Sequence, residues 1–369
     1  MDEIAACGVG AADAELEIEV RAAEGSFAFG RFARRSVSWL AGGAILYLLA
    51  PSILGVLGSA HRLVDIDWYW LIAVLLAEVA VLLCTWELQR LLIHAGPRTQ
   101  ESFVVIAASQ LVGNAVATAA PVGGAAGTAV QVRTLARRGT DARRAASGLV
   151  AFSLLQVASV GALALVGPFM VVLGMSVPAT LARTALYGCG ALVVITVVLV
   201  AALRTDTIVD RVGPLIARVA RRDPLRLTVT MRRERRHLRR ALAGPGSWKI
   251  MVVALARSIA DFLCLFFSVA AVTRWPSPAL VLLAFVAAAV LRMFPFTPGG
   301  LGPVEAALIA LLTAAVTTRS GAVLATLAYR VASLWLPLLL AVPAAWWLRR
   351  HPGLAPVRRL PVVARRLAA

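Results

Sequence analysis

Apolar segments long enough to cross a lipid bilayer constrain this chain more than any other feature of its sequence. One of them, WYWLIAVLLAEVAVLLCTWELQRLLI at residues 68–93, carries only three charged side chains. An α-helix needs about 20 residues to cross the roughly 30 Å of hydrocarbon in a bilayer. Hydrophobic residues make up 60% of the 369 residues, and the mean hydropathy of +0.82 is far above that of a soluble domain. The sequence therefore predicts an all-α, polytopic membrane protein.

Six segments have the length and apolar character of spanning helices. They are residues 37–58, 68–93, 145–172, 181–203, 249–273 and 322–348. Two further apolar regions, 102–138 and 279–317, are each interrupted by proline with a glycine pair, in APVGGAAGT and FTPGGLGP. Proline and glycine end helices, and non-helical backbone within a membrane is stable only where protein or a water-filled cavity surrounds it. We therefore predict two re-entrant helical hairpins in addition to the six spans.

Basic residues fix the expected orientation of these segments. Arginine and lysine cluster before the first span, after the first hairpin, within 204–249 (13 basic against four acidic residues) and after the last span. Because basic loops stay in the cytoplasm, both termini are expected there. This threading opens the first hairpin to the cytoplasm and the second to the exterior. The two hairpins then form an inverted repeat, which is typical of alternating-access transporters.

The chain is expected to form one membrane domain, residues 31–350, in the cytoplasmic (inner) membrane. The acidic segment 1–30 lacks the basic start and apolar core of a secretory signal, and it is predicted to be a disordered cytoplasmic tail. Residues 351–369 are predicted to be a basic cytoplasmic tail. The basic segment 204–248 has helical apolar spacing and is predicted to lie on the inner leaflet, where it would attract anionic lipids. Spans flank this segment, so a nucleic-acid partner is not expected.

Metal and redox chemistry are not indicated by the sequence. The four cysteines are scattered without a CxxC spacing, and the four histidines lie near segment ends or in loops. These patterns predict no disulfide framework, no metal site and no cofactor. No catalytic residue is predicted either. The oligomeric state stays open, a homo-oligomer included.

The two hairpin hinges are candidate anion sites. A helix that begins inside the membrane has unpaired N–H groups and a partial positive charge at its start, and glycine lets a ligand approach that backbone closely. In the second hairpin Gly302 is expected to cap the helix, with Pro303 as its first residue and Glu305 as its third. The alternative is that the glycine pairs only permit close helix packing. The predicted substrate-binding residues at the hinges are Gly123, Gly124, Thr128, Pro298, Gly299, Gly300 and Gly302.

Charged side chains inside apolar segments are the other candidates, because an ion in the membrane must face protein or water and find a partner. Glu305 and Arg330 form the preferred ion pair, either as a structural bridge or as part of the site. Arg292 precedes the second hinge and has no acidic residue next to it in the sequence. It is therefore the preferred anion contact.

Four more residues are weighed in the same way. Arg257 and Asp261 lie one helical turn apart and are expected to neutralise each other. Arg133 either contacts the substrate or extends to the interface as a snorkelling side chain. Asn114 either contacts a headgroup or bonds to a neighbouring helix.

The chain resembles a known family, the lysylphosphatidylglycerol synthase transmembrane region or flippase-like family, in PFTPGGLGPVEAALIALL, YRVASLWLP and NAVATAAPVGGAAGTAVQVRTLARRG. The resemblance covers about residues 35–350. It implies a bacterial cytoplasmic-membrane protein that moves a lipid between leaflets, such as an aminoacylated phospholipid or a polyprenyl-linked sugar. By motif match it implies a site built around Pro298, Gly299, Gly300, Gly302, Glu305 and Arg330.

Two differences from relatives limit what the resemblance implies. Some relatives join this region to a cytoplasmic aminoacyl-lipid synthase, and the residues after 350 are too few to hold one, so only the translocating part is expected here. The first hinge, PVGGAAG, replaces a more polar segment of many relatives. The chemistry of the headgroup therefore does not carry over.

Three functions remain as hypotheses. The first is a lipid flippase for an anionic or aminoacylated phospholipid or a polyprenyl-phosphate-linked sugar. The second is a membrane glycosyltransferase with a polyprenyl-phosphate donor, in which Asp65 and Asp67 of VDIDW would bind a metal; the same acids also fit an interfacial helix start beside Trp68. The third is a non-transporting scaffold for a cell-envelope enzyme.

Overall fold

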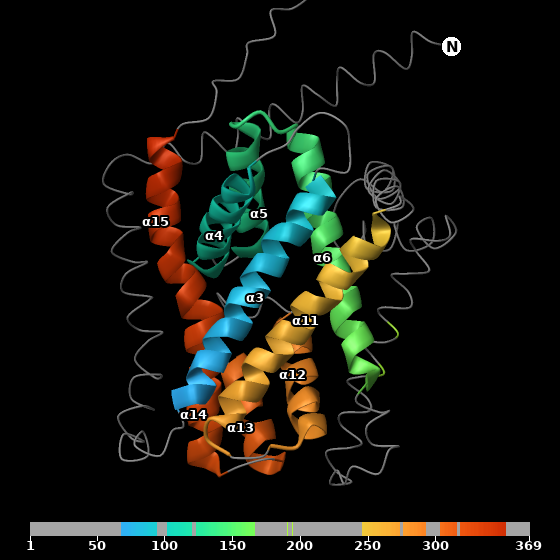
Figure 1. The fold of residues 1–369 in the computed structure, drawn as a ribbon, viewed down its shortest axis with the longest axis vertical. Helices are drawn as coiled ribbons and strands as arrows, with labels where there is room; N and C mark the ends of the chain where they lie inside the picture. The colour runs from blue at the N-terminus through green and yellow to red at the C-terminus, as the bar shows by residue number, and fades with distance from the viewer. Residues whose placement is uncertain are drawn as a thin grey trace, which may run out of the picture. The chain divides into compact units, whose positions relative to one another are not determined.

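The computed structural model describes residues 68–93, 102–119, 123–166, 190, 194, 246–273, 276–292, 303–315 and 318–351. All of them belong to the unit Gly55–Ala369. Its principal elements are α3 (Trp68–Ile93), α4 (Phe103–Ala119), α5 (Gly123–Ala136), α6 (Ala142–Ala164), α11 (Ser247–Ala270), α12 (Pro278–Arg292), α13 (Pro303–Ala315), α14 (Arg319–Arg330), the π-helix η3 (Val331–Trp335) and α15 (Leu336–Arg350). Figure 1 shows their arrangement.

Four helices of this unit are long and apolar enough to cross a membrane. They are Tyr69–Ile93, Ala142–Ala164, Ser247–Ala270 and the continuous helix Arg319–Arg350. These helices confirm four of the six predicted spans, with shifts of a few residues at their ends. The other two predictions, 37–58 and 181–203, fall outside the described residues except for Gly190 and Val194.

The shorter helices form two packed pairs. Helix α4 packs against α5 across a connection at 120–122, and α12 packs against α13 across a connection at 293–302. In Figure 1 the two pairs lie at opposite ends of the bundle, α4 and α5 near the upper end and α12 and α13 near the lower. Helix α13 begins at Pro303, as predicted, because proline lacks the N–H that a first helical residue leaves unpaired.

Glycine allows α4 and α5 to approach closely. A Cβ atom on Gly127 would lie 2.4 Å from the carbonyl oxygen of Gly113 and 2.7 Å from the Cβ of Ala117. A Cβ on Gly124, at the hinge itself, would meet nothing within 4 Å. The close-packing explanation therefore holds for Gly127, which the sequence did not single out, and not for Gly124.

Helices α3 and α11 form the most extensive interface among the described elements. They are antiparallel, and the pairing is regular: Leu92 and Leu88 of α3 share an apolar cluster with Ile250 and Ala254 of α11. Seen from the front, α3 and α11 cross the bundle side by side (Figure 1). The register set by this cluster determines which polar groups meet further along both helices.

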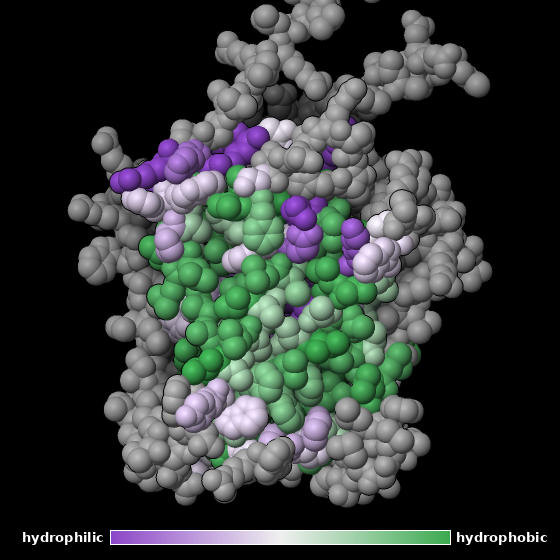
Figure 2. All heavy atoms as spheres, viewed as in Figure 1, coloured by the Kyte–Doolittle hydropathy of each residue, from purple (hydrophilic) through white to green (hydrophobic). Residues whose placement is uncertain are grey.

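The outer surface of these helices is suited to lipid. A broad apolar band covers the middle of the face shown in Figure 2, with hydrophilic residues above and below it. The exposed large apolar side chains on α3, α11 and α15 include Leu75, Leu76, Leu83, Met251, Leu255, Ile259, Leu339 and Val342. Such an exposed apolar surface is costly in water and favourable in a bilayer.

One end of the unit is basic. Exposed arginines lie at the turn between α5 and α6 and at the end of α15: Arg137, Arg143, Arg144, Arg349 and Arg350. Arg138 joins these two places, since its guanidinium donates to the carbonyl oxygen of His351 and stacks 5.0 Å from the ring centre of Trp347. The turn between α5 and α6 needs Gly139, whose φ is +100°.

Candidate functional site

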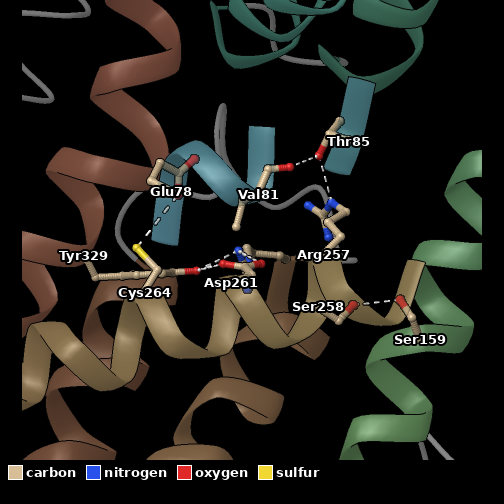
Figure 3. A network of polar contacts seen from close by, with 10 residues as sticks. Glu78, Val81, Thr85, Ser159, Arg257, Ser258, Asp261, Cys264 and Tyr329 are labelled. Atoms are coloured by element: carbon tan, nitrogen blue, oxygen red, sulfur yellow. Dashed lines mark hydrogen bonds and ion pairs between the residues drawn. The ribbon is translucent and has the colours of Figure 1, made fainter. Parts of the chain in front are cut away.

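The polar interior of the bundle is centred on one face of α11. Arg257, Asp261 and Cys264 follow each other at spacings of four and three residues, so they share a face. All three are buried. Figure 3 shows this face meeting side chains from α3 and α14, while neighbouring Ser258 points to Ser159 of α6. Polar groups from several helices therefore converge within the bundle.

Asp261 is the centre of a chain of contacts that joins three helices. The hydroxyl of Tyr329 on α14 donates to Oδ1 of Asp261 at 2.8 Å, and it accepts from Nη1 of Arg292 on α12 at 3.1 Å. The same Nη1 lies 3.8 Å from the other carboxylate oxygen, Oδ2. A hydroxyl that donates to an acid and accepts from a base stabilises both charges. This chain fixes α12 and α14 against α11.

Two expectations about these residues are corrected. Arg257 does not neutralise Asp261 by direct contact, because the aspartate is engaged by Tyr329 and Arg292 instead. Arg292, which has no acid beside it in the sequence, has one beside it in space. Periodicity along a single helix places Arg257 and Asp261 on one face, but it says nothing about partners that reach them from α12 and α14.

Glu78 reaches the same region from α3. Its side chain is only 2% exposed, and Oε2 lies 3.8 Å from the thiol of Cys264. The contact follows from the antiparallel register, since Glu78 and Thr85 are seven residues apart on α3 and meet Cys264 and Arg257, seven residues apart on α11 (Figure 3). The polar faces of the two helices thus lie in register against each other.

The guanidinium of Arg257 lacks both a carboxylate partner and a hydrogen-bond partner for Nη1 among the described residues. Its Nε donates to Oγ1 of Thr85 at 3.0 Å, and the Thr85 hydroxyl in turn donates to the carbonyl of Val81 at 2.7 Å. Its Nη1 is buried without a hydrogen-bond partner, and no described carboxylate forms an ion pair with it. Buried cations in membrane proteins usually have hydrogen-bond partners for their N–H groups and a paired carboxylate. Arg257 thus differs from Arg292 and Arg330, each of which lies within 4 Å of a carboxylate oxygen.

Glu305 and Arg330 form the ion pair that the sequence predicts. Oε1 of Glu305, in the first turn of α13, lies 2.7 Å from Nε of Arg330 at the end of α14. The arginine side chain is 7% exposed and the glutamate 21%. The pair joins the short helix α13 to the long helix that follows it.

A π-helical turn follows Arg330 at once. Residues Val331–Trp335 are π-helical, and Pro337 comes two residues later. Proline offers no N–H to the preceding turn and its ring crowds that turn's carbonyl, so the wider turn relieves both problems. Such turns frequently occur at functional sites. Here the turn adjoins Tyr329 and Arg330.

The remaining predicted residues are not part of this network in the described structure. Gly124 and Thr128 are exposed at the start of α5, beside Gly123, and the Thr128 hydroxyl bonds back to the carbonyl of Gly124 at 2.8 Å. Arg133 is exposed, and Asn114 on α4 is half-buried. Predicted positions outside the described residues are Asp65, Asp67, Pro298, Gly299, Gly300 and Gly302.

Three residues of the network were missed by sequence reasoning as partners of the charged groups: Thr85, Cys264 and Tyr329. The sequence holds a signal for each of them. Tyr329 directly precedes Arg330, and Thr85 shares a face of α3 with Glu78. Cys264 lies three residues after Asp261. The missing element was the packing of α3 against α11, which no single-helix pattern contains.

Comparison with known families identifies the chain's relatives. Residues 36–341 match the family model described as lysylphosphatidylglycerol synthase TM region. A search among curated proteins found no match. The matched range includes every residue of the polar network and both pairs of short helices. The chain therefore belongs to the lysylphosphatidylglycerol synthase transmembrane-region family.

Proposed function

We propose that the protein is a lipid translocase that moves a lipid with an anionic or aminoacylated phosphate headgroup, or a polyprenyl-phosphate-linked sugar, between the leaflets. The observation that carries the proposal is a polar network in a mostly apolar bundle: Glu78, Arg257, Asp261 and Tyr329 are buried. Arg292, whose side chain is 31% exposed, contacts Tyr329 and Asp261 at the edge of this network. Ions at this depth are costly and mark substrate pathways. The proposed activity moves a lipid and changes no covalent bond.

In this mechanism the headgroup and the chains take different routes. The headgroup passes through the polar interior, where Arg292 and Arg330 supply positive charge and the hydroxyl of Tyr329 supplies a polar contact. The acyl or prenyl chains stay on the exposed apolar faces of the long helices, represented by Leu76 on α3 and Leu255 on α11. Positive charge in a site of low dielectric favours an anionic headgroup over a neutral one.

Opposed short helix pairs support an alternating-access cycle. The order long, short, short, long occurs twice, in α3 to α6 and again in α11 to the α14–α15 helix. The proposal treats these two halves as an inverted repeat, with re-entrant pairs that open to opposite sides in turn.

The basic end of the unit supports the proposed orientation. Exposed arginines at the α5–α6 turn and at the end of α15 would face the cytoplasm under the positive-inside rule. The proposal therefore places the protein in a bacterial cytoplasmic membrane with both termini inside.

Lipid exchange in reconstituted vesicles tests the proposal. Purified protein is placed in vesicles that contain phosphatidylglycerol labelled on an acyl chain, and a membrane-impermeant reductant then destroys the label of the outer leaflet. The protein should expose inner-leaflet phosphatidylglycerol to the reductant much faster than protein-free vesicles do. Phosphatidylcholine should exchange more slowly, because the arginines would repel the choline cation of its headgroup.

Variants connect the activity to the network. Arg292→Gln removes one cation of the network, and exchange should fall by roughly tenfold or more if a charge-assisted contact is lost. Arg349→Gln removes an exposed arginine at the end of α15 and should exchange lipid as the wild type does. Equal exchange by Arg292→Gln, with both variants folded as judged by gel filtration, would contradict the role of the network.

A further inference from the structure

Arg257 is the starting point of a more specific assignment. It lies between α3 and α11 with Nε bonded to Thr85 at 3.0 Å, and its Nη1 is buried without a hydrogen-bond partner. The two acids nearest to it in the network are engaged elsewhere: Asp261 by Tyr329 and Arg292, and Glu78 by the thiol of Cys264. Among the described residues, no ion pair completes the coordination of this guanidinium.

A structural role does not explain Arg257. A neutral glutamine or an apolar side chain of similar size would pack between the helices without a buried charge, and such replacements often stabilise proteins. The only described hydrogen bond of Arg257, to a threonine hydroxyl, is one that a neutral side chain can also make. A charge retained at this position, with a buried Nη1 that no described group satisfies, fits a role in binding an anion.

The geometry of the cation points to an oxyanion. A guanidinium presents its N–H groups in a planar fork that matches two oxygens of a phosphate or carboxylate. Thr85 occupies the Nε side of this fork, which leaves Nη1 for the ligand. On the outer surface of the same two helices, Leu83 of α3 and Leu255 and Ile259 of α11 are exposed. The apolar chains of a bound lipid could lie on this surface.

We infer that Arg257 is the binding point for a phosphate-class anion, held between α3 and α11 with a phosphate oxygen on Nη1. The choice of phosphate among oxyanions rests on the proposed function, in which every candidate lipid carries one. Because α3 and α11 enclose Nη1, the two helices must separate locally for the ligand to enter.

Ligand-dependent thermal stability tests the inference without any transport measurement. Wild-type protein in an uncharged detergent is heated alone, with phosphatidylglycerol, with diacylglycerol of the same chains, and with inorganic phosphate. Phosphatidylglycerol should raise the Tm and diacylglycerol should not, because they differ only in the phosphoglycerol group. In Arg257→Gln the apparent affinity for phosphatidylglycerol should fall by roughly 10- to 100-fold, the effect of one lost charge-assisted hydrogen bond.

The variants separate a binding role from a structural one. Without ligand, Arg257→Gln should melt at the wild-type temperature or above it, since it removes a buried charge. Arg257→Lys keeps the charge without the fork and should recover part of the affinity, and Arg349→Gln should bind as the wild type does. If Arg257→Gln melts well below the wild type without ligand, the arginine is structural and the inference is wrong.

The source of the phosphate is decided by the same experiment. If inorganic phosphate alone raises the Tm, and Arg257→Gln abolishes the effect, the site takes a free anion. If neither phosphatidylglycerol nor inorganic phosphate acts through Arg257, the inference is overturned. If phosphatidylglycerol binds through Arg257 but no lipid exchanges in vesicles, the anion site stands and the translocase proposal fails.

Discussion

The ion pair of Glu305 and Arg330 could be a structural bridge or part of a binding site, and measurements of both stability and transport are needed to tell these roles apart. The pair lies 2.7 Å apart with the arginine 7% exposed. Removal of one partner from such a pair leaves an uncompensated charge, which typically costs about 3–5 kcal/mol. Removal of both partners leaves no charge to compensate. Stability and transport together therefore distinguish a structural bridge from a site.

Glu305→Gln is predicted to lower the stability of the folded protein by about 3 kcal/mol, because Arg330 keeps its buried charge. The double variant Glu305→Gln with Arg330→Gln should recover most of that loss. Thermal unfolding in detergent measures both, and lipid exchange is measured in parallel. Full recovery of exchange in the double variant would show that the pair only joins α13 to α14.

Sequence reasoning at this scale found the costly residues and only some of their partners. Charges inside apolar segments identify Arg257, Asp261, Arg292 and the pair that contains Glu305, because each is expensive in lipid. The partners depend on which helices touch. Arg292 has no acid beside it in the sequence, and its partners, Asp261 and Tyr329, come from α11 and α14.

At the scale of the elements, glycine has two different roles in the first helix pair. Gly127 lies where α4 and α5 nearly touch, since a Cβ there would come within 2.4 Å of a backbone oxygen of Gly113. A Cβ built on Gly124 would meet nothing within 4 Å. The backbone oxygen of Gly113 cannot move away from a Cβ on Gly127 as the end of a flexible side chain could. The two positions therefore make a matched pair of variants.

Gly127→Ala is predicted to destabilise the protein by about 1–3 kcal/mol through overpacking against α4. Gly124→Ala should leave stability unchanged or slightly raise it, because alanine favours helix and meets no neighbour. Thermal unfolding of the two variants side by side gives the answer. Equal stability of both would show that α4 and α5 are not packed as closely as described.

The long helices were predictable and the packing of the short ones was not. Four spans follow from length and hydropathy alone, and α13 starts at Pro303 because proline suits a first helical position. The approach of Gly113 to Gly127 depends on a contact between two helices. No periodicity within either helix carries that information.

At the scale of the whole molecule, the distribution of basic residues makes a prediction about sidedness. Arg137 lies at the α5–α6 turn and Arg349 in the last turn of α15, both exposed. Arg319 begins α14 at the other end of the same long helix. A helix of this length crosses the bilayer, so its two ends face opposite compartments.

In a variant without native cysteines, Arg137→Cys and Arg349→Cys should react with an impermeant maleimide only after the cells are opened. Arg319→Cys should react in intact cells, because the end of the long helix opposite the basic one faces the exterior. Reaction of all three in intact cells, or of none, would contradict the proposed threading. The result also fixes the direction in which each short helix pair opens.

The most direct test of the account is a structure of the protein in lipid nanodiscs that contain phosphatidylglycerol. The account predicts a phosphate density against Nη1 of Arg257, with α3 and α11 parted around it and the lipid chains on the outer apolar faces. Lipid density confined to the outer surface, with α3 and α11 still closed over Arg257, would contradict it.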